Sequence, residues 1–262
     1  MTAYPEAQQL LSLISLLPAG VLSGQLPAIA PSFTSSRLNQ ATDVLRATTL
    51  AYSNKEGTLH VLSPIQKYML AYHAPSDELV KPLEDYYCKL AKWSCSQPGD
   101  KDYKAASQNL EKVEANMEAI LLHALRHHPD FHVVHACLGF SQFLCWTRPR
   151  TEIISLATKV AQDLDESDLE AKCLQHMGDI LRTQDKYDEA TSILTGAKVQ
   201  FEATGNQMRA AQCLHSLGEI LWMQDKYDEA SFVRVTLRRG HSYMKILQDR
   251  GEPNRCDTLT QW

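Results

Sequence analysis

The residues best suited to chemistry are histidines gathered in one short stretch. His123 and His127 are four positions apart, so on a helix they could present two imidazoles to one metal ion. However, the stretch has neither the glutamate of an H-E-x-x-H signature nor a matched cysteine pair, and Pro129 divides it between two elements. The sequence therefore favours a solvated helix end with scattered histidines, and it predicts no metal site. The full set comprises His123, His127, His128, His132, His135 and Cys137.

Other catalytic and cofactor-binding signatures are missing from the sequence. It contains no G-x-x-x-x-G-K-[ST] loop for phosphates and no nucleophile elbow. The acidic run between Asp163 and Asp168 is typical of a solvated loop. We therefore predict no catalytic residue, no bound cofactor and no enzymatic activity.

Composition indicates a protein that works in the cytoplasm. The chain has 262 residues, a net charge of −5 and seven cysteines without short-range pairing, which favours buried thiols in a reducing setting. The net charge gives no electrostatic reason to expect nucleic acid or an anionic membrane as partner. The apolar run 10–22 resembles a signal peptide, but no lysine or arginine precedes Arg37 and Pro18 interrupts the run.

An internal repeat organises the second half of the chain. Residues 171–181 recur in modified form as 211–221, and residues 184–190 recur unchanged as 224–230, always 40 positions apart. A repeat of this length indicates stacked supersecondary units. Each copy predicts two helices joined by a polar turn, because its apolar residues follow helical spacing. In the first copy these are Leu174, Met177 and Leu181, then Ala190, Leu194, Ala197 and Phe201.

These two copies resemble the tetratricopeptide repeat (TPR) family. The matching residues are Leu174, Gly178, Tyr187, Ala190, Leu194 and Ala197, repeated as Leu214, Gly218, Tyr227 and Ala230. Two features depart from the family pattern: the period of 40 exceeds the usual 34 or so, and Glu202 replaces the proline at the repeat end. The resemblance implies that the first helix of each hairpin lines a concave face that binds a protein or peptide. The candidate partner-binding residues on this face are Gln175, Asp179, Arg182, His215, Glu219 and Trp222.

Residues 1–75 are predicted to form a separate winged-helix-like domain. Helices are expected near 5–17, 20–30 and 38–47, followed by strands at 48–53 and 58–62 around a glycine-containing turn. Three helices and then a β-hairpin is the winged-helix order. The third helix and the hairpin carry only Arg37, Arg46 and Lys55 as positive residues, which is too few for phosphate contacts. We therefore expect this domain to serve packing rather than DNA binding.

The remaining segments complete the predicted organisation. Residues 76–129 are predicted to form a helical connector, 130–170 a degenerate TPR-like hairpin, and 171–230 two TPR units, the second incomplete. Residues 231–262 form a divergent tail with six basic and three acidic residues, so its charge (6 − 3 = +3) opposes that of the rest. The predicted fold is mainly α, with the winged-helix-like domain followed by the connector and a short TPR α-solenoid.

Three segments extend the resemblance to a larger family. Residues 10–18, 61–69 and 116–125 resemble the region after the nucleotide-binding module in NACHT and NB-ARC signalling ATPases, particularly fungal ones that end in TPRs. The family order is nucleotide-binding core, winged helix, connector and repeats, and this sequence lacks the first. Many members have a nucleotide-sensing histidine in the winged helix, where this chain has Leu62. The resemblance implies the sensor or regulatory part of such a receptor.

Function is therefore expected to lie in protein binding. The main prediction is a scaffold or adaptor that binds a protein or peptide on the concave TPR face. The alternative is a non-functional or self-associating truncated paralogue, with a homo-oligomer formed through the open end of the array. For Trp222, packing against the connector or tail is the alternative to partner binding.

Overall fold

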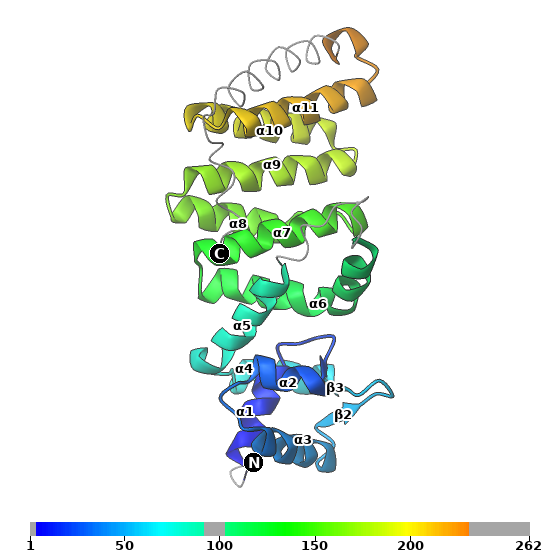
Figure 1. Ribbon diagram of the computed structural model, residues 1–262, viewed down its shortest axis with the longest axis vertical. Helices are drawn as coiled ribbons and strands as arrows, with labels where there is room; N and C mark the ends of the chain where they lie inside the picture. Colours follow the sequence, from blue (N-terminus) through cyan, green and yellow to red (C-terminus); the bar gives the residue numbers. More distant parts are fainter. Residues whose placement is uncertain (1–3, 92–102, 231–262) are drawn as a thin grey trace, which may run out of the picture. The chain divides into compact units, whose positions relative to one another are not determined.

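The computed structural model describes residues 4–91 and 103–230 (Figure 1). The described chain is mainly helical, with one small three-stranded sheet. It divides into two compact units, and the boundary between them along the chain lies between Leu164 and Asp165. Residues 92–102 of the predicted connector and the predicted tail 231–262 lie outside the described residues. The finer domain boundaries drawn from the sequence stay predictions.

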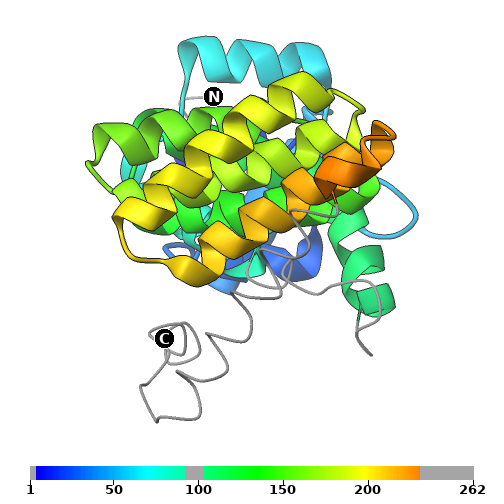
Figure 2. The ribbon, with the colours of Figure 1, turned by 90° about the horizontal axis from the view of Figure 1, so that it is seen from above.

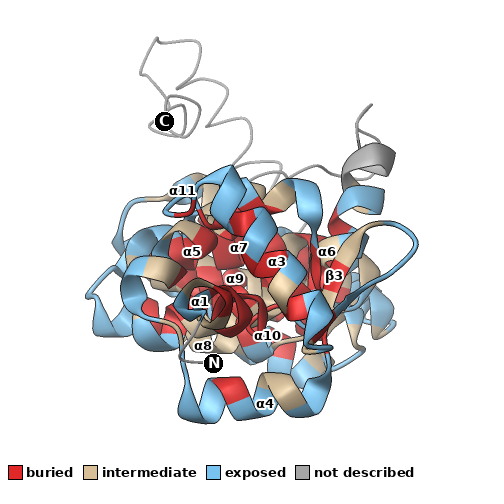
Figure 3. Ribbon diagram, turned by 90° about the horizontal axis from the view of Figure 1, so that it is seen from below, coloured by how far each residue is buried: buried red, intermediate tan, exposed pale blue. Residues whose placement is uncertain are grey.

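The N-terminal part of the first unit combines short helices with an antiparallel sheet whose strand order is β1-β3-β2. Leu10, Leu13, Leu45 and Leu59 are fully buried in its core. Figure 3 shows that α1 is mostly buried whereas α4 is mostly exposed. The elements are α1 Pro5–Ile14, β1 Val21–Leu22, η1 Ser23–Gln25, α2 Leu26–Ile29, α3 Ser35–Ala47, β2 Ala51–Ser53, β3 Thr58–Val61 and α4 Ser63–Tyr72.

The predicted helix at 20–30 is wrong in its first half, where the chain forms β1. Gly20 has a φ of +73°, a conformation that favours glycine, and a Cβ there would lie 2.6 Å from the carbonyl oxygen of Leu59. Val21 and Leu22 then pair with Leu59 and Thr58 of β3. The predicted hairpin is confirmed, because β2 pairs with β3. In its turn, Asn54 Oδ1 accepts hydrogen bonds from the backbone N–H groups of Glu56 and Thr58.

Four longer helices complete the first unit. The side chain of Asn116, on α6, is buried and connects these helices to the N-terminal part of the unit. It accepts a hydrogen bond from Ala19 N at 2.8 Å and donates one to the carbonyl oxygen of Gly20 at 2.7 Å. The helices are α5 Asp77–Ala91, α6 Tyr103–His127, α7 Phe131–Thr147 and α8 Glu152–Asp163.

Within its described residues, the second unit contains the helices α9 Ser167–Thr183, α10 Tyr187–Ala203 and α11 Gln207–Met223. Figure 2 shows α10 and α11 lying side by side. The repeat is visible in the turns, because Asp185 and Asp225, 40 positions apart, have φ values of 59° and 60°. In each turn the aspartate accepts a hydrogen bond from the tyrosine two residues on, Tyr187 or Tyr227.

The core of the second unit depends on one close helix approach. A Cβ at Gly178 of α9 would lie 2.6 Å from Cγ of Leu194 on α10, so only glycine permits this packing. Ala190, Ala197 and Phe201 of α10 are fully buried around it. Cys213 belongs to the same apolar cluster. Cys173 is also buried in the second unit and Cys137 in the first, so the prediction of buried thiols is confirmed for these three.

None of the described helices combines the length and the apolar character that a membrane crossing requires.

Candidate functional site

The predicted partner-binding residues of α9 pair with α11. Gln175 Nε2 donates to Gln212 Oε1 at 3.3 Å, and Ser216 Oγ donates to Asp179 Oδ1 at 2.7 Å. Arg182 forms an ion pair with Glu219, with 3.1 Å between Nη1 and Oε2. Each pair joins residues 37 positions apart, so the contacts repeat along the two helices. We call these three pairs the α9–α11 ladder.

The expectation that Gln175 faces outward is wrong, because its exposed fraction is 6%. Its Oε1 accepts a further hydrogen bond from Arg209 Nη1 at 3.1 Å, so both ends of the amide are occupied by α11. Helical periodicity placed Gln175 on the polar side of α9. It could not show that the next repeat covers that side.

Burial shifts the pKa of two groups on α9. It raises the pKa of Asp179, and the hydrogen bond from Ser216 opposes this shift only in part. Burial lowers the pKa of His176 to about 4, and the positive charge of Arg209 acts in the same direction. His176 is therefore neutral at physiological pH.

The equivalent residues of α11 are the other half of the predicted set, and they are more open. His215, Glu219 and Trp222 lie 40 positions after Gln175, Asp179 and Arg182. His215 and Trp222 are exposed, the latter by 55%, and the Trp222 ring packs edge-on against Tyr227 with ring centroids 4.9 Å apart. We call His215, Glu219 and Trp222 the open face of α11.

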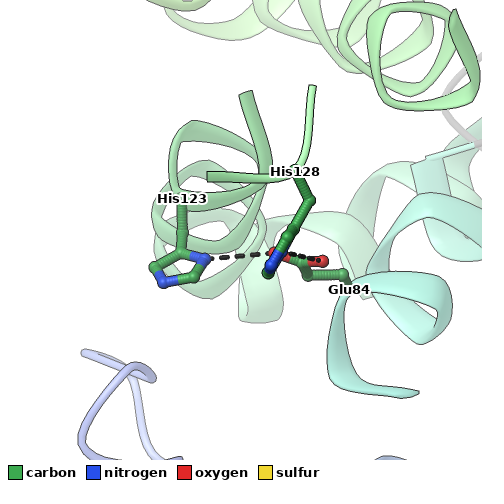
Figure 4. A group of neighbouring side chains, drawn as sticks. All are labelled: Glu84, His123 and His128. Atoms are coloured by element: carbon green, nitrogen blue, oxygen red, sulfur yellow. Dashed lines mark hydrogen bonds and ion pairs between the residues drawn. The ribbon is translucent and has the colours of Figure 1, made fainter. Parts of the chain in front are cut away.

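The histidine stretch forms a cluster that the sequence did not predict. His123 and His128 both point toward the carboxylate of Glu84, which comes from α5 (Figure 4). His123 Nδ1 lies 3.1 Å from Glu84 Oε1, and His128 Nδ1 lies 3.0 Å from Glu84 Oε2. Among the described residues, these three offer ligand atoms that all lie within 4.8 Å of one another.

The expected solvated helix end is therefore wrong for His123 and His128, which are both partly buried. The spacing of His123 and His127 is not the one that brings two imidazoles to Glu84. His127 packs its ring against His123, and His128, just after α6, supplies the second imidazole to Glu84.

Electrostatics favours a charged Glu84 and a charged His128. Burial alone would raise the pKa of Glu84, which is 1% exposed, but the hydrogen bonds from His123 and His128 outweigh it and lower the pKa. The hydrogen bond to Glu84 raises the pKa of His128, assisted by Asp77. The ion pair therefore persists over the range between the two pKa values.

One signal in the sequence could have indicated that Glu84 is a buried charge with a partner. It occupies an inward position of α5, where Val80, Leu83, Tyr87 and Ala91 are its buried neighbours at helical spacing. A charged residue at such a position requires a partner. The identity of that partner could not be read from the sequence, since His123 is 39 residues away.

Comparison with known proteins gives no match. No protein-family model, no curated protein and no solved structure is significantly similar to this chain.

Proposed function

We propose that the chain is a protein-interaction module in which the second unit binds a helix of a partner protein on the open face of α11. One observation carries the proposal. The open face occupies, at a spacing of 40, the same helix positions through which α9 holds α11 in the ladder, and the acidic residue Asp179 recurs there as Glu219. A surface that already packs against a helix in one repeat is suited to pack against another helix in the next.

The ladder suggests the chemistry of that partner helix. Asp179 accepts a hydrogen bond from a serine hydroxyl, so Glu219 at the equivalent position, whose carboxylate also pairs with Arg182 and His215, suits one further hydroxyl or cationic donor. Trp222 lies at the position where α9 has Arg182. Arg182 faces the acidic Glu219, whereas Trp222 suits an apolar partner residue. The expected partner is thus an amphipathic helix with a donor and an apolar residue about one turn apart.

The repeat pattern of the sequence does not continue at the next repeat position. From residue 247, forty positions after the start of α11, the sequence lacks the leucine and glycine pattern of α9 and α11 and contains Gly251 and Pro253. The partner helix is therefore proposed to come from another protein.

The wider setting follows from the family resemblances. In the proposed arrangement, a winged-helix-like domain and a connector precede TPR units, as in the regulatory part of cytoplasmic NACHT or NB-ARC receptors. The repeated turns at Asp185 and Asp225 and the close approach at Gly178 support the TPR part of this assignment. The β2–β3 hairpin after α3 supports the winged-helix part.

The test uses a helix-stapled, fluorescein-labelled peptide of residues 206–224 with Glu219→Leu. This peptide keeps Ser216 to pair with Glu219 of the protein and places leucine opposite Trp222. We expect saturable binding by fluorescence anisotropy, weakened about tenfold by Trp222→Ala in the protein, because large aromatic residues dominate such contacts.

Trp146→Ala is the matched control, because Trp146 lies in the first unit and is 57% exposed, much like Trp222. The control should bind the peptide like the parent chain. Equal affinity of the parent and of Trp222→Ala, or no saturable binding, would overturn the site. If the parent chain forms a dimer that Trp222→Ala dissolves, as measured by sedimentation velocity, a second copy occupies the open face instead of a partner.

A further inference from the structure

We propose that Glu84, His123 and His128 form a binding site for a divalent transition metal ion of the Zn²⁺ class. The ligands are one carboxylate oxygen of Glu84 and the Nδ1 atoms of the two histidines (Figure 4). The site lies wholly within the first unit and is independent of the open face of α11.

The spacing of the three ligand atoms suits such an ion. The two Nδ1 atoms each lie 3.1 Å from Oε1 of Glu84, and the three ligand atoms all lie within 4.8 Å of one another. In a tetrahedral zinc site with bonds of about 2.0–2.1 Å, neighbouring ligand atoms are roughly 3.3 Å apart. The two nitrogen–oxygen distances are therefore close to those that such an ion requires.

The donor set selects among metals. Two imidazoles and one carboxylate suit Zn²⁺ and similar transition ions, whereas Mg²⁺ and Ca²⁺ prefer oxygen ligands throughout. The negative charge of the Glu84 carboxylate partly neutralises the two positive charges of the ion. Three protein ligands leave a fourth position for water or for a group from another molecule, as in zinc sites that are not purely structural.

A neighbouring carboxylate orients one of the ligands. Asp77 Oδ1 lies 3.4 Å from Nε2 of His128, on the opposite side of the ring from Glu84. Histidines that bind metals commonly donate the second ring N–H to a carboxylate, which fixes the tautomer with the other nitrogen toward the ion. When the ion binds, the Nδ1 proton of His128 leaves to solvent, and His123 carries its proton on Nε2.

The surrounding elements hold the ligands in place. Glu84 is fixed on α5 by the buried residues around it, and its exposed fraction is only 1%. His123 lies on α6, and the backbone N–H of His128 donates to the carbonyl of Ala124 at 2.8 Å. The ion would therefore join α5 to the end of α6, two helices that already pack together.

The first test is isothermal titration of the full-length chain with Zn²⁺ under reducing conditions. We expect one site per chain, with affinity at least tenfold weaker in His123→Asn and in His128→Asn. Asparagine places its amide nitrogen near the position of Nδ1, so it preserves the hydrogen bond to Glu84 but is a poor metal ligand. His132→Asn is the control, since His132 is exposed and outside the cluster, and it should bind like the parent.

A second measurement needs no variant and so does not depend on variant folding. In long-range ¹⁵N–¹H spectra of the parent chain, Zn²⁺ should shift Nδ1 of His123 and of His128 and leave His132 unchanged. With Co²⁺, the visible spectrum should show nitrogen and oxygen ligands without a thiolate band, because Cys88, one turn from Glu84 on α5, is not among the ligands.

Three results would overturn the proposal. The first is the absence of saturable Zn²⁺ binding by the parent chain. The second is an unchanged affinity in both asparagine variants, which would indicate adventitious binding elsewhere, for example at cysteines. The third is a Zn²⁺-induced shift confined to histidines outside the cluster.

Discussion

The two units satisfy their buried polar groups in different ways. In the second unit, the α9–α11 ladder joins residues that are always 37 positions apart, so one repeat provides the partners for the next. In the first unit, Glu84 is held by His123 and His128, from a stretch of sequence unrelated to α5. The ladder spreads its polar contacts over several weak pairs, whereas the cluster concentrates them on one buried charge.

The difference indicates where each unit is vulnerable. Loss of one ladder pair leaves the others in place, and several of the groups involved can reach water. Loss of the Glu84 carboxylate removes the shared acceptor of both histidines at once. We therefore expect single substitutions to have larger effects in the cluster than in the ladder.

The largest effect is expected from Glu84→Ala. Removing a buried carboxylate that accepts hydrogen bonds from two histidines should lower the free energy of unfolding of the first unit by about 2–3 kcal/mol. Asp85→Ala is the control, because Asp85 is exposed and pairs only with the exposed Lys81, and it should cost less than about 0.5 kcal/mol. Urea unfolding monitored by circular dichroism measures both, and equal effects would contradict the concentration of energy at Glu84.

Gly178→Ala should destabilise the second unit by about 2 kcal/mol, since the new Cβ overlaps the Leu194 side chain and forces the helices apart. Gly196→Ala in α10 provides a matched comparison, because a Cβ there meets nothing within 4 Å. It should leave stability unchanged or raise it by up to about 1 kcal/mol through helix propensity. Thermal unfolding of the two variants would fail to support the packing argument if both moved in the same direction.

Acidification should weaken the second unit through His176. Its pKa is about 4 in the folded chain and about 6.5 when unfolded. The unfolded state therefore binds the proton more readily, and stability is complete above pH 6.5 and falls as the pH drops toward 4.

Between pH 7.5 and 5.5 the expected loss is about 1.3 kcal/mol. The raised pKa of Asp179 acts with the opposite sign, because a carboxyl that holds its proton more tightly when folded gains stability on acidification. Comparing the parent with His176→Asn isolates the histidine. A parent and a variant with the same pH dependence would show that folding does not lower the pKa of His176.

The smallest effect is expected from Ser216→Ala, which removes one rung of the ladder. Asp179 loses its donor but stays near Arg182, so the cost should be about 0.5–1 kcal/mol. Ser192→Ala, on an exposed part of α10, should cost nothing measurable. A loss above about 2 kcal/mol for Ser216→Ala would mean that the ladder concentrates its energy as the Glu84 cluster does.

Much of the second unit could be predicted from the sequence. The 40-residue repeat and its helical spacing predicted the helices seen as α9, α10 and α11, and Gly178, one of the residues of the repeat pattern, lies at a close helix contact. These features depend on neighbouring residues along the chain. The candidate partner-binding residues share a helix side for the same reason, but α11 covers Gln175 and leaves Trp222 exposed.

The first unit was predicted less completely. The β2–β3 hairpin was expected from its turn residues, whereas β1 was not, because a two-residue strand forms only when a partner strand provides its hydrogen bonds.

The sequence by itself determined most of the helical segments and the apolar side of the helices in the repeat, since both depend on the local order of residues. The tertiary structure alone decided that Glu84 meets His123 and His128, and that Gln175 lies under α11 while Trp222 does not. Such contacts depend on how helices cross and on how the chain turns between them. A difference of one position, His128 in place of His127, then determines which imidazole reaches the carboxylate.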